Sequence, residues 1–178
     1  MSAFIPSSLY GVIGWPLAQS LSPLLHNTAF QALGIPAAYM LWELPPEKLP
    51  RFVDSMRLLG IRGCSVTLPH KVEILPLLDH RSERVELMGA ANTLYWRDDR
   101  LCGENTDVTG FMHPLLERGL DPATPVLVLG AGGAARAVVC GLWLHGCPPH
   151  LRDHAFRPFP CAAGGALRRH GRALGRAS

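Results

Sequence analysis

The chain has 178 residues, 48% of them hydrophobic, and carries a formal net charge of +3. This length fits one domain or a small pair, with enough apolar side chains for a buried core. No run of 18 apolar residues occurs and no secretory signal opens the chain, so we expect no membrane partner and a cytoplasmic location.

Strand and helix signals alternate from residue 9 to residue 145. Short apolar runs predict buried strands, and apolar residues spaced three to four apart predict helices. The expected strands are 9–14, 38–42, 62–67, 92–96, 100–103 and 126–129. The expected helices are 22–33, 46–59, 72–78, 82–89, 107–119 and 134–145. Strands that alternate with helices in this way indicate an α/β fold with a mostly parallel sheet.

Turn and capping residues mark several of these boundaries. Asp98 and Asp99 separate two strands that we expect to pair as a hairpin. Ser22 is the expected N-cap of the first helix, and Asp107 is a good N-cap for the fifth. Gly146 suits the C-cap of the sixth helix.

A glycine-rich segment follows the last expected strand directly and opens the last expected helix. It consists of Gly130, Ala131, Gly132, Gly133, Ala134 and Ala135. Such glycines let the backbone turn tightly against a pyrophosphate, whose charge the helix N-terminus favours. The segment predicts the start of a dinucleotide-binding unit, and a glycine-rich turn in another kind of α/β protein is the alternative.

The composition changes at residue 148. Residues 1–147 hold eleven Lys and Arg against thirteen Asp and Glu, a net charge of −2, whereas residues 148–178 hold six Arg against one Asp, a net charge of +5. The tail is a basic arm for nucleic acid, a solvated extension, or the product of a reading-frame change in a GC-rich gene. We favour the frame change, because the break falls where a second strand of the dinucleotide-binding unit should begin. We therefore expect a disordered tail and no nucleic-acid partner.

Two pairs of polar residues stand where strands give way to helices. Ser20 and Ser22 lie at the start of the first helix, where hydroxyls and the helix dipole suit a carboxylate, although plain capping is the simpler explanation. Thr67 and Lys71 follow the third strand, at the edge where ligands of α/β sheets bind. Lysine, unlike arginine, can exchange its proton in an acid–base step, and a solvated lysine is the alternative.

The remaining polar residues have simpler explanations. Asn92 and Asp107 flank the hairpin and suit the capping of turns and helices. The histidines show no metal-ligand spacing, and the five cysteines are scattered without a CxxC pair. We therefore expect no metal site and reduced thiols.

Taken together, these motifs resemble the shikimate dehydrogenase family over residues 9–147. The matching pieces occur in the family's order and with family-like spacing. They are GVIGWP at 11–16, SLSP at 20–23, HN at 26–27, VTLPHK at 66–71, GAANT at 89–93, GENTD at 103–107 with Gly110, and GAGGAA at 130–135. Each piece alone is weakly diagnostic, whereas the combination is specific.

The resemblance implies a substrate site for shikimate or 3-dehydroshikimate. Ser20 and Ser22 would bind the substrate carboxylate. Thr67, Asn92 and Asp107 would hydrogen-bond the carboxylate and the ring hydroxyls. Residues 1–120 would form the substrate-binding domain of an enzyme of aromatic amino-acid biosynthesis.

The resemblance also implies a reaction, in which 3-dehydroshikimate is reduced to shikimate with NADPH. Lys71, paired with Asp107, would transfer the proton. Residues 121–147 would begin an incomplete Rossmann-like NADP-binding domain, in which 130–134 hold the pyrophosphate and Glu83 approaches the cofactor.

Two departures from the family pattern stand out. Ser65 occupies a position where the family has asparagine, and we expect a local adjustment there rather than a lost site. Pro148 and Pro149 fall where the second Rossmann strand should be, and two prolines do not suit a central strand. We expect an oxidoreductase of the shikimate dehydrogenase type, with the activity of this shortened chain left open, and a non-catalytic shikimate-binding module and a quinate or shikimate dehydrogenase are the alternatives.

Overall fold

The computed structural model describes residues 5–129, 133–147 and 150–151 and has the expected α/β class. The strands are β1 (Ser8–Gly14), β2 (Ala37–Glu43), β3 (Ile61–Val66), β4 (His80–Arg81), β5 (Thr93–Arg97), β6 (Arg100–Glu104), β7 (Leu127–Val128) and β8 (His150–Leu151). The α-helices are α1 (Ser22–Ala32), α2 (Leu49–Leu58), α3 (His70–Glu73), α4 (Glu83–Met88), α5 (Asp107–Glu117) and α6 (Gly133–Leu144). Two 3-10 turns are η1 (Pro46–Lys48) and η2 (Leu75–Leu77).

Six strands form one sheet in the order β2-β1-β3-β5-β6-β4. Three of its five pairings are parallel, namely β1 with β2, β1 with β3 and β4 with β6, which confirms the expectation of a mostly parallel sheet. The central strand β5 runs antiparallel to β3 and to β6, and the second of these pairings is the expected hairpin. The carboxyl ends of β1, β3 and β6 therefore meet the start of β5 at one edge of the sheet.

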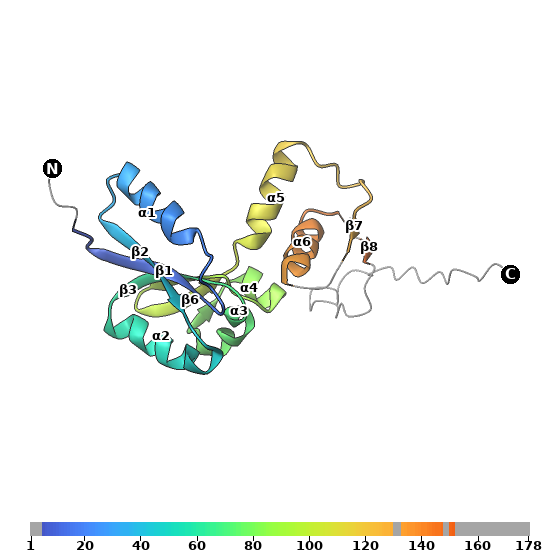
Figure 1. Ribbon diagram of the computed structural model, residues 1–178. Helices are drawn as coiled ribbons and strands as arrows, with labels where there is room; N and C mark the ends of the chain where they lie inside the picture. Colours follow the sequence, from blue (N-terminus) through green and yellow to red (C-terminus); the bar gives the residue numbers. More distant parts are fainter. Residues whose placement is uncertain (1–4, 130–132, 148–149, 152–178) are drawn as a thin grey trace.

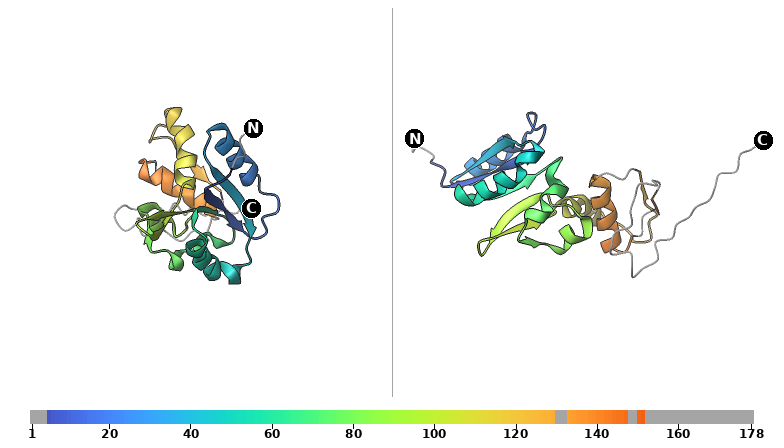
Figure 2. Two further views of the ribbon diagram at one scale, coloured as in Figure 1. Left: turned by 90° about the vertical axis from the view of Figure 1, so that its left-hand side faces the viewer. Right: turned by 90° about the horizontal axis from the view of Figure 1, so that it is seen from below.

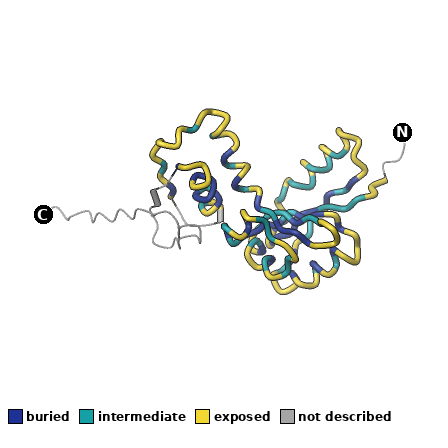
Figure 3. The backbone as a smooth tube through the Cα atoms, turned by 180° about the vertical axis from the view of Figure 1, so that it is seen from behind, coloured by how far each residue is buried: buried dark blue, intermediate teal, exposed yellow. Residues whose placement is uncertain are grey.

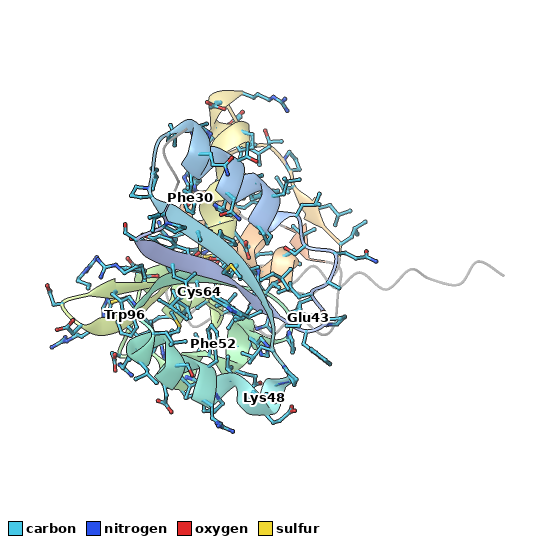
Figure 4. The ribbon with its side chains drawn as sticks, turned by 60° about the vertical axis from the view of Figure 1, so that its left-hand side comes forward. Phe30, Glu43, Lys48, Phe52, Cys64 and Trp96 are labelled. Atoms are coloured by element: carbon cyan, nitrogen blue, oxygen red, sulfur yellow. The ribbon has the colours of Figure 1, made fainter. Side chains whose placement is uncertain are left out.

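Helices cover both faces of this sheet (Figure 1). The main core lies on the α2 side and includes Ile13, Met56 and Leu94, none of them more than 1% exposed. Phe30 of α1 and Phe52 of α2 lie on opposite sides of the sheet (Figure 4). The face of the sheet next to α1 is less well covered than the face next to α2. No residue of α1 is buried, whereas α2 has three buried residues (Figure 3).

A second core forms where α6 packs beside α5 (Figure 2). It joins Met88 of α4 and Met112 of α5 to Cys140 and Leu142 of α6. The strands β7 and β8 pair in parallel across α6, which is the βαβ arrangement of a Rossmann-like unit. We did not expect a strand after Pro148 and Pro149, and this expectation was wrong, because the prolines precede the paired residues 150–151 in the sequence. The rest of the tail, 152–178, lies outside the described residues.

Three expected boundaries also need correction. Ser22 is the first residue of α1 rather than its cap, and Leu21 holds the N-cap position. Asp107 is the first residue of α5, with Thr106 before it as the N-cap. The segment expected as one helix over 72–78 consists of the short α3 followed by the 3-10 turn η2.

Candidate active site

The candidate site lies at the edge of the sheet where β1, β3 and β6 end. Lys71 is carried by α3, which follows β3 after a three-residue turn. Asn92 immediately precedes β5, and Asp107 opens α5 after the two residues that follow β6. Because β5 runs antiparallel to its neighbours, residues far apart in the sequence come together here. This is the edge at which open α/β sheets bind ligands.

An ion pair between Lys71 and Asp107 is the centre of this cluster. Lys71 Nζ donates to Asp107 Oδ2 at 2.7 Å, and the two side chains are 24% and 34% exposed. Asn92 Nδ2 donates to the other carboxylate oxygen, Oδ1, at 2.8 Å. The carboxylate is thus held on both oxygens, and the ammonium group stays partly open to a ligand. The expected pairing of Lys71 with Asp107 is present in the structure.

Asn92 uses its side-chain amide within the protein. Besides Asp107, Nδ2 donates to Thr106 Oγ1 at 3.0 Å. The amide oxygen accepts from the Thr93 hydroxyl at 2.8 Å and from the Thr106 backbone N–H at 3.0 Å. These bonds fix the orientation of Asn92 and thereby of the Asp107 carboxylate. Direct contact between Asn92 and a substrate stays a prediction.

A second layer of polar residues, which the sequence analysis did not assign, holds the start of α5. Asn105 is fully buried, donates to the Ala90 carbonyl and accepts from the Asp107 backbone N–H at 3.0 Å. Glu104 accepts from Ser82 and from both Nε and Nη2 of Arg84. Both residues belong to the GENTD segment at 103–107.

The Glu104 carboxyl has a lowered pKa. Burial by itself raises its pKa, but the hydrogen bonds from Arg84, from the Asn105 backbone N–H and from Ser82 together outweigh burial and bring the pKa below its ordinary value. The charged carboxylate is therefore the form that this network stabilises.

Ser20 and Ser22 lie at the N-terminus of α1, beyond the end of β1. Ser20 Oγ accepts the Ser22 backbone N–H at 3.3 Å, so Ser20 rather than Ser22 satisfies a donor at this helix end. Among the described residues, the Ser22 hydroxyl makes no hydrogen bond. Both side chains are partly exposed at the same edge of the sheet as Lys71, and their contact with a carboxylate stays a prediction.

Thr67 directly follows β3 and lies beside the end of β1. Its backbone N–H donates to the Ile13 carbonyl at 3.0 Å, and its own carbonyl accepts from the His70 N–H. A Cβ on Gly14 would lie 2.5 Å from Thr67 Cγ2, so glycine is needed at the end of β1. The close approach fixes Thr67 beside the candidate site with a half-buried side chain.

The expected cofactor residues are only partly described. Gly130, Ala131 and Gly132 lie outside the described residues, whereas Gly133 begins α6 and Ala134 is exposed in its first turn. Glu83 is exposed at the start of α4, and within the described part of the chain it makes no hydrogen bond to the Lys71–Asp107 pair. A strand, β7, precedes this glycine-rich segment and a helix, α6, begins within it, which is the order of elements found at pyrophosphate sites.

Among the described residues, no group of three or more His, Cys, Asp and Glu side chains is placed to hold a metal ion. None of the helices in the described ranges is long and apolar enough to cross a membrane. The site thus combines the partly exposed Lys71 ammonium group with the Asp107 carboxylate that holds it. Three hydroxyl-bearing side chains lie at the same edge of the sheet: Ser20, Ser22 and Thr67. Such a set suits a small ligand that is anionic and hydroxylated and that exchanges a proton.

The chain is similar to enzymes of known activity. Residues 12–94 match the family model of the shikimate dehydrogenase substrate binding domain. The shikimate dehydrogenase (NADP(+)) of Pelobacter propionicus is 62% identical over 139 residues, which cover 76% of this chain and 49% of that protein. The chain therefore spans about half the length of the curated relatives that it matches.

Solved structures of shikimate dehydrogenases have the same fold. The Listeria monocytogenes shikimate 5-dehydrogenase in complex with shikimate and NAD matches with a TM-score of 0.79 and 36% identity, over 88% of this chain and 56% of that chain. The Thermus thermophilus enzyme in complex with NADP(H) and shikimate matches with a TM-score of 0.74 and 40% identity, over 81% of this chain and 55% of that chain.

Proposed function

Because the chain belongs to the shikimate dehydrogenase family, we propose that it carries the substrate-binding part of an NADP-dependent enzyme that reduces 3-dehydroshikimate to shikimate. The observation that carries this proposal is the Lys71–Asp107 pair, 2.7 Å apart at the carboxyl edge of the sheet. Residues 1–120 form the proposed substrate domain and 121–147 the start of the cofactor domain.

Lys71 has the role of the proton-transfer group. Reduction of a ketone places negative charge on its oxygen, and a proton donor next to that oxygen lowers the barrier. The Lys71 ammonium donates its proton to the forming alkoxide, and Asp107 keeps the ammonium in position. In the reverse direction Lys71 accepts the proton from the substrate hydroxyl.

Substrate recognition is assigned to the hydroxyls around this pair. Ser20 and Ser22 bind the substrate carboxylate at the N-terminus of α1, where the helix dipole favours negative charge. Thr67 and Asp107 bind ring hydroxyls, and Asn92 acts at least by holding Asp107. Within the described part of the chain, neither the Ser20 nor the Ser22 hydroxyl donates a hydrogen bond, so both can donate to a substrate carboxylate.

NADPH, when bound, supplies the hydride. Residues 130–134, which follow β7 and include the first two residues of α6, are the proposed pyrophosphate site, because a glycine-rich segment between a strand and a helix suits a phosphate. The exposed first turn of α6 fits this role.

The test is an assay of the full chain with shikimate and NADP(+), combined with calorimetric titration of shikimate. We expect shikimate to bind, and we expect Lys71→Ala to lower any NADPH formation by at least a factor of about 100, since general acid–base catalysis contributes factors of that size. Lys48→Ala is the matched control, because Lys48 is the other lysine and lies exposed in η1.

Binding without turnover is the second candidate function, because the described residues after α5 contain a single βαβ unit, β7–α6–β8, on the cofactor side. Calorimetric binding of shikimate together with no NADPH formation would establish it. A chain that binds neither shikimate nor quinate would contradict both candidates, and preference for quinate would change only the substrate.

A further inference from the structure

His70, the first residue of α3, is a fully buried side chain to which the proposed function gives no role. Its ring nitrogen Nε2 lies 2.7 Å from the Leu44 carbonyl oxygen. A carbonyl only accepts hydrogen bonds, so Nε2 carries the proton and is the donor, which leaves Nδ1 as an acceptor. Nδ1 is buried and has no hydrogen-bond partner among the described residues. Within that part of the chain, the bond to Leu44 is therefore the single polar contact of this ring.

Leu44 is itself fixed at the edge of the sheet that carries the candidate site. It directly follows β2, and its backbone N–H donates at 2.9 Å to the carbonyl of Gly14, the last residue of β1. Its side chain is only 8% exposed and belongs to the main core. The carbonyl that accepts from His70 is thus held both by a backbone hydrogen bond and by apolar packing.

The helix α3 depends on contacts with the rest of the protein, because it has only four residues and a single helical turn is not stable by itself. Ile74 directly follows α3 and is fully buried four residues after His70, so the two side chains lie on the same face. Lys71, between them, is 24% exposed and reaches Asp107. The backbone of Lys71 is held by the Ala91 N–H, which donates to its carbonyl at 2.8 Å.

Packing alone does not explain a histidine at position 70. An apolar side chain of similar size would pack there without a ring nitrogen that needs a donor, and a buried acceptor without a donor costs free energy. Histidine adds the hydrogen bond to Leu44, one residue before Lys71. Because the lysine side chain is a flexible four-carbon stem, the position of its ammonium group depends on how firmly its backbone is held.

We propose that His70 is a positioning residue for Lys71. Its bond to the Leu44 carbonyl fixes the start of α3 and thereby keeps the Lys71 ammonium group at hydrogen-bond distance from Asp107. The ring is fully buried, so it acts through Lys71 and not by contact with a substrate. The inference rests on the proposed function, because it concerns the lysine to which that function assigns the proton transfer.

The first experiment measures how fast the two lysines of the full chain, Lys48 and Lys71, react with acetic anhydride, and mass spectrometry follows each lysine separately. Lys71 in its ion pair is expected to react more slowly than the exposed Lys48. His70→Leu keeps a similar volume but removes the donor. It is expected to speed the acetylation of Lys71 about threefold, the size of effect of one hydrogen bond, and to leave the rate of Lys48 unchanged.

Two polar variants separate the hydrogen bond from packing. The amide of His70→Gln ends where Nε2 stands and can donate to Leu44, whereas the amide of His70→Asn ends where Nδ1 stands and does not reach Leu44. His70→Gln is expected to keep Lys71 as slow as in the parent chain, and His70→Asn is expected to speed its acetylation. Ile74→Val is the packing control, because Ile74 is equally buried and has no polar group. It is expected to lower the free energy of unfolding without a change in the rate of Lys71.

The second experiment is calorimetric titration of shikimate into the same variants. His70→Leu is expected to weaken binding about threefold in the parent chain and to have no further effect when it is combined with Lys71→Ala, since it acts through Lys71. His70→Gln is expected to bind shikimate as the parent chain does.

The inference is wrong if His70→Leu leaves the acetylation rate of Lys71 unchanged, if Ile74→Val raises this rate equally, or if His70→Gln behaves like His70→Asn. An equal loss of affinity with and without Lys71 is a structural effect and also contradicts it. In each of these cases the proposed function stands if Lys71→Ala weakens shikimate binding. If the parent chain does not bind shikimate, the proposed function is overturned, whereas the acetylation rates still decide whether His70 holds Lys71.

Discussion

At the scale of single residues, the charge state of the Glu104 carboxyl affects how firmly the backbone around Asp107 is held. Its carboxylate accepts the Asn105 backbone N–H at 2.7 Å, and Asn105 in turn holds the backbone of Asp107. Because its pKa is lowered in the folded protein, the charged carboxylate stabilises the fold at pH values above its unfolded pKa of about 4.3. This contribution is lost as the pH falls through the folded pKa.

We therefore expect Glu104→Gln to lower the free energy of unfolding at neutral pH, and the difference from the parent chain to shrink below about pH 4.3. Urea unfolding at a series of pH values measures this difference. Glu47→Gln is the control, since Glu47 is exposed in η1 and its substitution is expected to leave the free energy of unfolding close to that of the parent chain. If the difference in free energy of unfolding between Glu104→Gln and the parent chain stays constant down to about pH 3, well below the ordinary carboxyl pKa, the charge of Glu104 does not stabilise the fold.

The sequence predicted residue types at this site better than it predicted their partners. Lys71 was expected from its place after a strand end, which marks the ligand edge of an α/β sheet, whereas the pairing of Asp107 with Lys71 was implied by the family resemblance. Capping was the simplest explanation for Asp107 taken alone, but its carboxylate binds Lys71 and Asn92 instead. Local patterns cannot show such partners, since they depend on which strands become neighbours. The hydrogen bond from His70 to Leu44 was missed for the same reason, because the two residues lie 26 residues apart along the chain.

At the scale of elements, Gly11 of β1 leaves no room for a side chain beside β2. A Cβ at this position would lie 2.6 Å from the Met40 carbonyl oxygen and 2.2 Å from a ring carbon of Trp42. The backbone oxygen cannot move without disturbing the parallel pairing of these strands. We expect Gly11→Ala to lower the free energy of unfolding by about 2 kcal/mol, which chemical denaturation measures.

Gly110→Ala provides the matched control for this prediction. Gly110 lies inside α5, where an added Cβ meets nothing within 4 Å. Alanine is the better helix former, so the substitution is expected to stabilise the protein by about 0.5 to 1 kcal/mol. Equal effects of the two substitutions would contradict the close approach at Gly11.

The sequence predicted the long elements and missed the short ones. The amphipathic spacing in 46–59 correctly indicated α2, whose Leu49, Val53 and Met56 are buried. The left-handed conformations of Asp98 and Asp99 fit the expected hairpin turn. Two-residue strands such as β4 and β8 carry too few side chains for a period to be visible. The order of the strands was also beyond reach, because it depends on contacts between distant segments.

At the scale of the whole molecule, two cores overlap along the chain. The first gathers buried residues from 13–101 and the second from 88–147. The expected domain boundary after residue 120 separates segments of sequence, whereas α5, which precedes it, packs with α6, which follows it. The proposed boundary at residue 120 therefore divides the chain within the second core, and removal of residues 121–178 would uncover Val108 and Met112.

Damage to each core is expected to destabilise a different set of elements, and hydrogen exchange can measure which elements are affected. Met112 of α5 is 2% exposed, and its Cγ lies 2.5 Å from the position of a Cβ on Gly141 of α6, which shows how closely the helices approach. Met112→Ala removes a buried side chain from the second core at a cost of about 3 kcal/mol. Hydrogen exchange followed by mass spectrometry is expected to show faster exchange in α5 and α6, with β1 and β3 unchanged.

Met56→Ala is the matched comparison, because Met56 is fully buried in the first core. It is expected to speed exchange in β1 and β3, and in α6 as well, since the start of α5 depends on the sheet through Asn92 and Asn105. We therefore expect the coupling to be one-sided: the sheet stays folded when the second core is weakened, whereas the second core needs the sheet. Identical exchange patterns in the two variants would mean that the described chain unfolds as a single unit, and shikimate binding would then depend on α6 as much as on the sheet.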